Sequence, residues 1–296
     1  MIDLQQPLGR PEPWPAPGKL NLFLHVVGRR SDGYHLLQTA FQFIDLCDEI
    51  RFWARPAGIV ERVSDLPGVP AEDDLCVRAA RLLALHAPSA PGVALEVTKR
   101  LPLQGGVGGG SSDAATVLVA LNELWGLQLP IEQLAGLGLA LGADVPVFVQ
   151  GTAAWAEGVG ERLTPLELPE PVYLLVRPDA TVSTAEVFKA PELTRDSAAI
   201  TIPGFLQTGG RNDCEPVVRR RFPAVAEALD WLDGFAPARL TGTGSCVFAA
   251  LPDEAQARVA LASLPRRWTG YVVRGLNRSP LLARRRLECA GMASGR

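Results

Sequence analysis

The sequence contains little lysine, little histidine and no paired cysteines. Only three of its 29 basic residues are lysines, namely Lys19, Lys99 and Lys189. The five cysteines are scattered without a C-x-x-C pair, and the three histidines show no metal-ligand spacing. These absences argue against a disulfide framework and against a bound transition metal. We therefore expect reduced thiols, a cytoplasmic location and no metal ion held by protein ligands alone.

A basic surplus and a long apolar run are absent as well. The formal net charge is −3 over 296 residues, whereas nucleic-acid-binding proteins usually carry a basic footprint. No apolar run reaches the roughly 20 residues that span a bilayer. The first residues lack the charged and then apolar pattern of a secretory signal. We expect small-molecule partners, with no nucleic acid and no membrane.

Glycine, in contrast, is concentrated in residues 101–115. Five glycines fall within six positions and are followed by Ser111, Ser112 and Asp113. The two serines and the aspartate are good caps for a helix over residues 114–124. A glycine-rich turn that leads into a helix N-terminus offers free N–H groups to a phosphate. The stretch does not fit the Walker pattern, which needs a lysine. It does not fit the dinucleotide pattern either, because Ser111 stands where that pattern requires its last glycine.

Alternating and periodic patterns predict the other elements. Residues 18–27 read as a strand that places Lys19 and Asn21 on one face. Strands are expected over 39–45 and 49–54, joined by a short polar turn, and over 93–98, 172–177 and 270–275. Helices are expected over 75–86, 223–232 and 255–264. Residues 1–15 read as a loose leader, and the polar chain after Arg284 is expected to fray.

The irregular order of strands and helices predicts an α+β or mixed α/β fold with two lobes. Three prolines crowd residues 165–171 and are typical of a connection between domains. We place the boundary near residue 160, with one lobe over 1–160 and the other over 161–296.

Three features could form one catalytic site. The first is the glycine stretch with its serine hydroxyls, the second is Asp144 and the third is Lys19. Asp144 stands among apolar residues, where a carboxylate needs a partner or a task. Separately, Asp144 reads as a turn aspartate and Lys19 as a solvent-facing strand lysine. Together they indicate phosphoryl transfer to a hydroxyl, with Asp144 as base and Lys19 stabilising charge.

Three blocks resemble the signature motifs of the GHMP kinases, a family of galactokinase, homoserine, mevalonate and phosphomevalonate kinases. They are residues 15–24 (PAPGKLNLFL), 102–115 (PLQGGVGGGSSDAA) and 240–248 (LTGTGSCVF). Five further blocks are similar to the branch whose acceptor is a methylerythritol that carries a cytidine diphosphate. These are 32–35 (DGYH), 141–148 (LGADVPVF), 156–160 (AEGVG), 212–215 (NDCE) and 275–280 (GLNRSP).

The resemblance implies a fold, a reaction and a set of site residues. The fold would combine an N-terminal lobe like the second domain of ribosomal protein S5 with a C-terminal ferredoxin-like lobe. Asp144 and Lys19 would be catalytic, ATP and Mg²⁺ would be the cofactors, and the chain would be a monomer or weak homodimer. ATP would contact Lys99, Pro102, Gly105, Gly106, Val107, Gly108, Gly109, Gly110, Ser111 and Ser112. The acceptor would contact Asn21, Tyr34, His35, Asp144, Thr184, Phe188, Lys189, Gly242, Thr243 and Gly244.

The resemblance also assigns particular roles at the two ends of the site. Tyr34 and Phe188 would sandwich the cytosine ring, His35 would read its polar edge, and Lys99 would lie by the adenine. Base–aromatic stacking is worth about 1–3 kcal/mol per base. The sequence departs from the family in having Gly18 where alanine is common and Asp74 where asparagine is usual.

Two other functions fit parts of the sequence. One is a GHMP kinase that acts on mevalonate or homoserine, which have no base to stack. In that case Tyr34, His35 and Phe188 would be ordinary core residues. The other is a non-catalytic relative that only binds a ligand. The presence of Asp144, Lys19 and the glycines argues against it.

Overall fold

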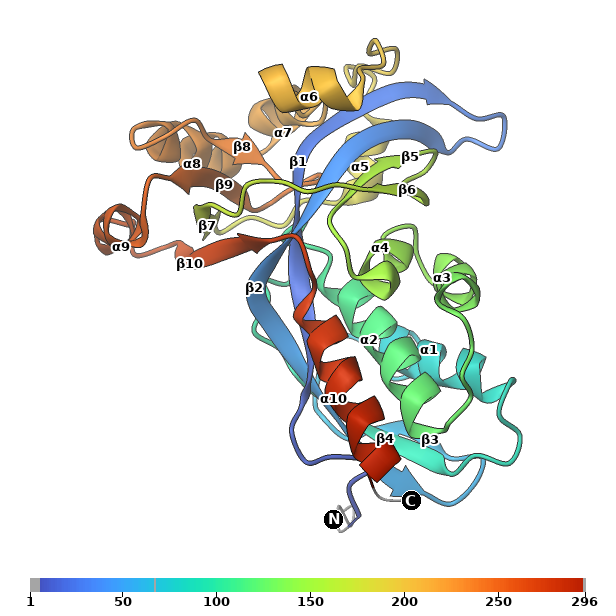
Figure 1. The fold of residues 1–296 in the computed structure, drawn as a ribbon. Helices are drawn as coiled ribbons and strands as arrows, with labels where there is room; N and C mark the ends of the chain where they lie inside the picture. Colours follow the sequence, from blue (N-terminus) through green and yellow to red (C-terminus); the bar gives the residue numbers. More distant parts are fainter. Residues whose placement is uncertain (1–5, 67, 295–296) are drawn as a thin grey trace.

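The computed structural model describes residues 6–66 and 68–294 (Figure 1). The strands are β1 (Trp14–Arg29), β2 (His35–Arg55), β3 (Val60–Arg62), β4 (Gly92–Thr98), β5 (Ala154–Glu157), β6 (Arg162–Pro165), β7 (Val172–Arg177), β8 (Arg239–Leu240), β9 (Val247–Leu251) and β10 (Thr269–Leu276). The helices are α1 (Leu75–Ala84), α2 (Gly109–Leu124), α3 (Ile131–Leu139), α4 (Val145–Gln150), α5 (Thr184–Lys189), α6 (Ile202–Thr208), α7 (Glu215–Arg221), α8 (Pro223–Asp233), α9 (Glu254–Ala262) and α10 (Pro280–Ser294). This combination of helices and strands confirms the predicted α+β class.

A long antiparallel hairpin of β1 and β2 joins the two lobes. The pairing runs from Trp14 opposite Ile50 to Arg29 opposite His35. Strand β4 pairs with one half of β2 and β5 with the other, and β10 pairs with β2 between them (Figure 1). The predicted turn within residues 45–49 was wrong. Its polar residue Asp48 is fully buried in a continuous strand, where the carboxylate binds Lys99.

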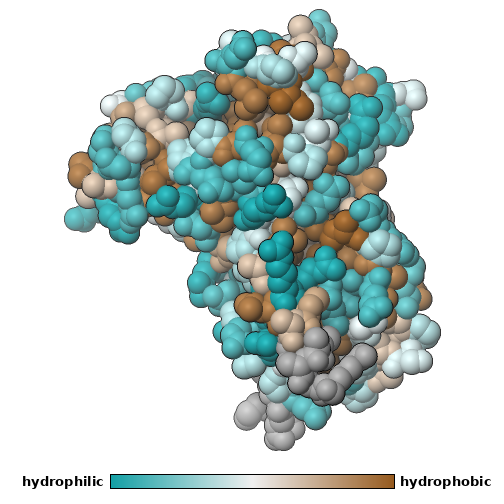
Figure 2. Space-filling view, in the orientation of Figure 1, coloured by the Kyte–Doolittle hydropathy of each residue, from teal (hydrophilic) through white to brown (hydrophobic). Residues whose placement is uncertain are grey.

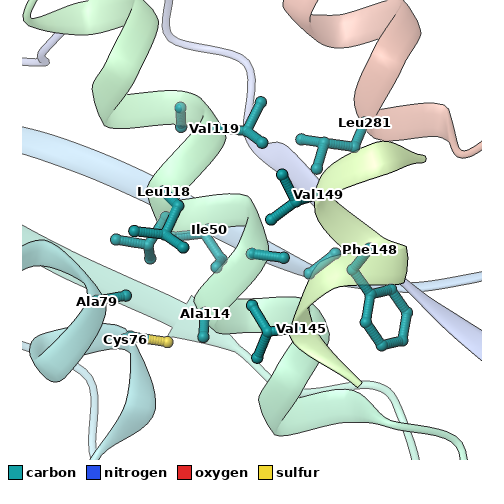
Figure 3. Close-up of a cluster of buried hydrophobic side chains, with 14 of the residues drawn as sticks. Ile50, Cys76, Ala79, Ala114, Leu118, Val119, Val145, Phe148, Val149 and Leu281 are labelled. Carbon is teal, nitrogen blue, oxygen red and sulfur yellow. The ribbon is translucent and has the colours of Figure 1, made fainter. Parts of the chain in front are cut away.

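The first lobe buries its largest core between the sheet and the helices α1, α2, α4 and α10. Helix α2 is buried on most sides, which explains its nearly unbroken apolar sequence. Figure 3 shows side chains from these four helices meeting in this core, with Leu281 contributed by α10. The prediction that the chain frays after Arg284 was wrong. Arg284 is buried, donates to Glu288 at 2.6 Å and lies over the Trp14 ring.

The second lobe is an antiparallel sheet in the order β10-β7-β9-β8, packed against α8 and α9. Its core includes Leu24 and Val26 from β1, so the hairpin contributes to both cores. β10 also pairs with β2 at two positions, and this joins the sheets of the two lobes. The boundary at residue 160 stays a prediction. The structure also shows that α10, which follows the second lobe in the sequence, packs on β1 in the first lobe.

Most of the surface in view is hydrophilic, with apolar residues gathered around α6 at the top of the molecule (Figure 2). Helix α6 begins after the cap residue Thr201, whose side chain accepts from the Gly204 amide. Within the described residues, no helix combines the length and hydropathy needed to cross a membrane. The leader predicted over 1–15 falls partly outside the described residues. Its described part is held to β2, because the amide of Leu8 donates to the carbonyl of Phe52 at 2.9 Å.

Candidate active site

The glycine loop turns sharply into α2. Gly106 and Gly108 have φ angles of +76° and +74°, which other residues rarely adopt. Because the turn occurs at Gly108, α2 begins at Gly109, and the first helical hydrogen bond runs from the Ser112 amide to the Gly108 carbonyl at 2.8 Å. The prediction that Ser111, Ser112 or Asp113 caps the helix was wrong, because all three already lie within it. No side chain caps this N-terminus, which leaves its first N–H groups for a ligand.

The five glycines fall into two groups according to what a side chain would meet. A Cβ atom would lie 2.5 Å from Cys246 Sγ at Gly105, 2.3 Å from the Thr241 carbonyl at Gly106 and 2.8 Å from the Phe148 ring at Gly108. At Gly109 and Gly110 the nearest atoms would be at ordinary contact distances of 3.5 and 3.6 Å. Protein packing therefore explains the first three glycines. It does not explain the last two, at the helix N-terminus.

Backbone hydrogen bonds hold the loop against two distant segments. The Lys19 amide donates to the Val107 carbonyl at 2.9 Å, which fixes the loop to β1. The Cys246 amide donates to the Gly105 carbonyl at 3.1 Å, and the Thr241 hydroxyl donates to the Gly106 carbonyl at 3.3 Å. The three blocks that resemble the family's signature motifs thus form one unit.

Lys19 and Asp144 meet beside this loop. Lys19 is 3% exposed, and its Nζ lies 3.3 Å from Asp144 Oδ2. The same Nζ donates to Asn21 Oδ1 at 2.5 Å and to the Gly106 carbonyl at 3.0 Å. Asp144 directly precedes α4, and its side chain is 34% exposed. The lysine is therefore shielded and fixed, whereas the carboxylate is open to an incoming molecule.

A second cluster lies where the hairpin of β1 and β2 turns. His35, the first residue of β2, stacks on Phe188 of α5 with ring centroids 5.0 Å apart. Tyr34 beside it is 64% exposed. Burial lowers the pKa of His35, and the nearby cations of Arg195 and Arg29 lower it further. The imidazole is therefore neutral at pH 7, and its Nε2 accepts a hydrogen bond from Arg195 Nε at 3.2 Å.

One cleft of about 1020 Å³ joins these groups. Of the predicted site residues, it is lined by Lys19, Asn21, Tyr34, His35, Gly106, Gly108, Ser111, Asp144, Thr184, Phe188, Lys189, Gly242 and Thr243. The Thr184 and Thr243 hydroxyls are hydrogen-bonded at 2.9 Å, which connects α5 to the loop that follows β8. The remaining predicted residues are not among those that line the cleft; they are Lys99, Pro102, Gly105, Val107, Gly109, Gly110, Ser112 and Gly244.

Sequence reasoning missed several residues of this cleft. Arg29, Thr39, Phe41 and Arg195 line it, and Lys19 Nζ lies 5.4 Å from the centre of the Phe41 ring. Thr39 and Phe41 share the face of β2 that is turned to Lys19 and Asn21, so the alternation along the strand could have indicated them. Arg195 lies in a segment without a periodic pattern, and no local signal marks it.

Lys99 lies in a buried ion cluster behind the loop. Its Nζ binds Asp48 and also Asp113 Oδ2, the latter at 2.6 Å. Burial disfavours the lysine's charge, but the two carboxylates outweigh this effect and raise its pKa. Asp48 also accepts the amides of Arg100 and Leu101, so the cluster ties β2 to the start of the glycine stretch and to α2. The predicted contact between Lys99 and ATP remains a prediction.

Asp74, the departure from the family pattern, has a partner of its own. Its carboxylate forms a buried ion pair with Arg62 and accepts the Cys76 amide at 2.6 Å as the cap of α1. Arg62 also donates to the carbonyls of Ser64 and Val69. A negative charge at position 74 is therefore neutralised locally, and it fixes the segment that leads into α1.

Within the described ranges, no group of three or more His, Cys, Asp or Glu side chains could hold a metal ion. One hydroxyl near the loop is available as a ligand. Ser112 Oγ is buried and has no hydrogen-bond partner in the described part of the chain.

Comparison with known structures defines the class of the fold. A crystal structure of 4-(cytidine 5'-diphospho)-2C-methyl-D-erythritol kinase superposes with a TM-score of 0.79 and 32% identity, covering 89% of this chain and 98% of that one. Homoserine kinase from Cytophaga hutchinsonii shares the fold, with a TM-score of 0.70, 16% identity and coverage of 94% and 98%. The fold is thus the two-lobe fold of these kinases.

Sequence comparison identifies the family. The model described as "GHMP kinases N terminal domain" matches residues 74–152, and the one described as "GHMP kinases C terminal" matches residues 202–270. The chain belongs to the GHMP kinase family, and it is a phosphotransferase with an alcohol acceptor. Kinases of this family use ATP.

Two relatives with high sequence identity have the same protein name as each other. The 4-diphosphocytidyl-2-C-methyl-D-erythritol kinase of Nitrosococcus oceani is 62% identical over 91% of this chain and 96% of its own length. The protein of that name from Halorhodospira halophila is also 62% identical, over 90% of this chain and 94% of its own length.

Proposed function

We propose that this kinase transfers the γ-phosphoryl group of ATP to the 2-hydroxyl of 4-diphosphocytidyl-2-C-methyl-D-erythritol, a step of the non-mevalonate route to isoprenoid precursors. The observation that carries the proposal is the cleft in which the Lys19–Asp144 pair lies between the glycine loop and the His35–Phe188 stack. The names of the relatives at 62% identity support this acceptor.

In the proposed reaction, Asp144 acts as the general base. It takes the proton of the 2-hydroxyl while that oxygen bonds to the γ-phosphorus and the bond from the γ-phosphorus to ADP breaks. Phosphoryl transfer depends mainly on positioning and charge stabilisation, and the base orients the nucleophile. The 34% exposure of Asp144 leaves the carboxylate accessible to a hydroxyl. Lys19, held by Asn21 and the Gly106 carbonyl, orients the carboxylate through the ion pair and stabilises charge that develops on the phosphoryl oxygens.

The glycine loop would bind the phosphates of ATP. The uncapped N-terminus of α2 supplies N–H groups and the positive end of the helix dipole. Gly109 and Gly110 have no side chain to keep a phosphate away from these groups. Mg²⁺ keeps several water ligands and is usually bound through phosphates and one or two protein oxygens. We propose that such an ion would be held by Asp144, which lines the cleft, and by Ser112 Oγ, which lies at the start of α2 without a hydrogen-bond partner among the described residues. The bound ion would neutralise charge on the phosphates.

The cluster of Tyr34, His35 and Phe188 would recognise the cytosine. Stacking on two aromatic rings is sequence-tolerant and worth about 1–3 kcal/mol per base, whereas a hydrogen bond from His35 would add selectivity. Thr184 and Thr243, which are hydrogen-bonded to each other, would contact the diphosphate together with the backbone of Gly242 and with Lys189.

The test is a coupled assay of ADP release with Mg·ATP and three acceptors: the diphosphocytidyl compound, mevalonate and homoserine. We expect turnover with the first acceptor at a kcat/KM at least about a hundredfold above the others, because a site that stacks a base gains nothing from an acceptor without one. Equal turnover of mevalonate would favour the alternative GHMP kinase. Absence of ADP release with every acceptor would favour a non-catalytic ligand-binding protein.

A further inference from the structure

Arg195 makes a dense set of hydrogen bonds at the acceptor end of the cleft. Its Nε donates to His35 Nε2 at 3.2 Å, and its Nη1 donates to the Leu193 carbonyl at 3.0 Å. Its Nη2 donates to the carbonyls of Phe188 and Ala190 at 2.9 and 2.7 Å. The four bonds use most of the five N–H groups of a guanidinium, and they go to three carbonyls and one imidazole.

Two of these carbonyls lie at the C-terminal end of α5. Carbonyls in the last turn of a helix have no helical partner, and a cation there is also favoured by the helix dipole. Arg195 therefore fixes the end of α5, which carries Phe188. Through Nε it also donates to His35, the first residue of β2. One side chain thus connects the two rings that stack at 5.0 Å.

We propose that Arg195 is the positioning residue of the acceptor end, which holds Phe188 and His35 together so that the base of the acceptor meets a preformed site. The inference rests on the proposed function only for the identity of that base. A preformed site binds its ligand more tightly, because binding does not have to pay the entropic cost of ordering side chains and loops.

The charges around His35 agree with this arrangement. Nε2 can accept from Arg195 only if the imidazole is neutral, with its proton on Nδ1. Burial and the cations Arg195 and Arg29 lower the pKa of His35, which favours that form. The other charged side chains that line this part of the cleft are Asp32 and Lys189. Removal of the Arg195 charge should therefore raise the pKa of His35 toward the ordinary value of 6.5.

The first measurement is an NMR titration of the histidine ring signals, with the His35 signal assigned from His35→Gln. We expect an upward shift of the His35 pKa in Arg195→Gln. In Arg195→Lys, which keeps a positive charge, we expect a smaller shift. Arg258→Gln, on the exposed face of α9, is the matched control and should leave the His35 signal unchanged. This readout does not depend on turnover, so it decides the contact even if the enzyme accepts a different alcohol.

The second measurement is steady-state kinetics with ATP and the diphosphocytidyl acceptor. Hydrogen bonds that involve a charged group are strong enough for their loss to raise the acceptor KM about tenfold or more in Arg195→Gln. The KM for ATP should stay within about twofold, because the hydrogen bonds of Arg195 go to His35, α5 and the segment that follows it, and not to the glycine loop. Arg195→Lys should also raise the acceptor KM, since an ammonium cannot reproduce the planar fork.

Several outcomes would overturn the proposal. One is an unchanged His35 titration in Arg195→Gln. Another is an acceptor KM that stays at the wild-type value. A third is an equal rise in both KM values, which would indicate general loosening. Thermal melts of both variants separate these cases from misfolding, and Arg195→Lys keeps the test available if Arg195→Gln does not fold. A wild-type enzyme with no activity on the diphosphocytidyl acceptor would contradict the proposed function and leave the titration to decide the role of Arg195.

Discussion

The two ends of the cleft are built from different parts of the chain. The glycine loop presents backbone N–H groups at the start of α2 and is held in place by backbone hydrogen bonds. The other end presents side chains, of which His35 and Phe188 stack on each other and Arg195 connects them. A site made of backbone N–H groups requires a particular backbone conformation, whereas a site made of side chains requires particular residues. We infer that substitutions in the glycine loop act through steric clashes and backbone strain. Substitutions at the other end act through the loss of side-chain contacts.

The largest expected effect is at the point between the two ends. Asp144→Asn keeps the size of the side chain and an oxygen for Lys19, but it removes the carboxylate that we propose as the base. General acid–base catalysis typically contributes about 10²- to 10⁴-fold, so we expect kcat to fall within that range while both KM values change by less than about threefold. Steady-state kinetics of Asp144→Asn and of the exposed control Asp179→Asn measure this. A kcat within a few-fold of wild type would show that the proton leaves by another route.

The next effect tests the division within the glycine loop. In Gly106→Ala the new Cβ would meet the Thr241 carbonyl at 2.3 Å, and the backbone would keep a φ of +76°. Left-handed backbone alone costs roughly 1–2 kcal/mol in other residues, so the free energy of unfolding should fall by at least about 2 kcal/mol. Urea unfolding followed by circular dichroism measures it.

Gly110→Ala is the matched variant for Gly106→Ala, and it should not lower the free energy of unfolding. Its Cβ would find ordinary contacts, and alanine is favoured over glycine within a helix by about 1 kcal/mol. We expect unchanged or slightly raised stability together with an ATP KM about tenfold higher, because the methyl group enters the space that we assign to a phosphate. An ATP KM equal to that of the wild type would contradict this assignment.

An effect of comparable size is expected from loss of stacking at the other end. Phe188→Leu keeps an apolar side chain but removes the ring, and a base–aromatic stack of about 1–3 kcal/mol corresponds to a rise of roughly five- to 150-fold in the acceptor KM. The ATP KM should not change. Phe235→Leu, on a 43% exposed side chain, serves as the control. Equal effects of Phe188→Leu on both substrates would remove the distinction between the two ends.

The smallest effect concerns the ion cluster behind the loop. Burial raises the pKa of Asp113 to about 7; Lys99 opposes this rise and Asp48 adds to it. In the unfolded chain the value is 3.8, so between these pH values the folded state binds a proton that the unfolded state does not. The contribution of Asp113 to stability is therefore complete below about pH 4 and is lost as the pH rises to about 7.

Asp113→Asn should remove this pH dependence. Unfolding free energies at pH 5, 6, 7 and 8 should fall with pH in the wild type by on the order of 1 kcal/mol more than in the variant. Asp230→Asn, on the exposed side of α8, should follow the wild type. Parallel curves for the wild type and Asp113→Asn would show that Asp113 stays ionised over this range.

Much of the glycine-loop end of the cleft could be predicted because its signals are local. The glycines, the apolar helix after them and the alternation that places Lys19 beside Asn21 are all short-range patterns. The continuity of β2 could not be predicted, because Asp48 reads as a turn residue until Lys99, 51 positions away, neutralises it. Arg195 could not be predicted either, since its partners are mostly backbone carbonyls, which leave no trace in the sequence.

The return of α10 to the first lobe has a consequence for the order of synthesis. Leu281 belongs to the core of that lobe, and the buried pair of Arg284 and Glu288 lies against Trp14, at the start of β1. A ribosome makes these residues after the whole second lobe. The first lobe therefore cannot complete its core until α10 has been made. The lobe that is made first is finished last.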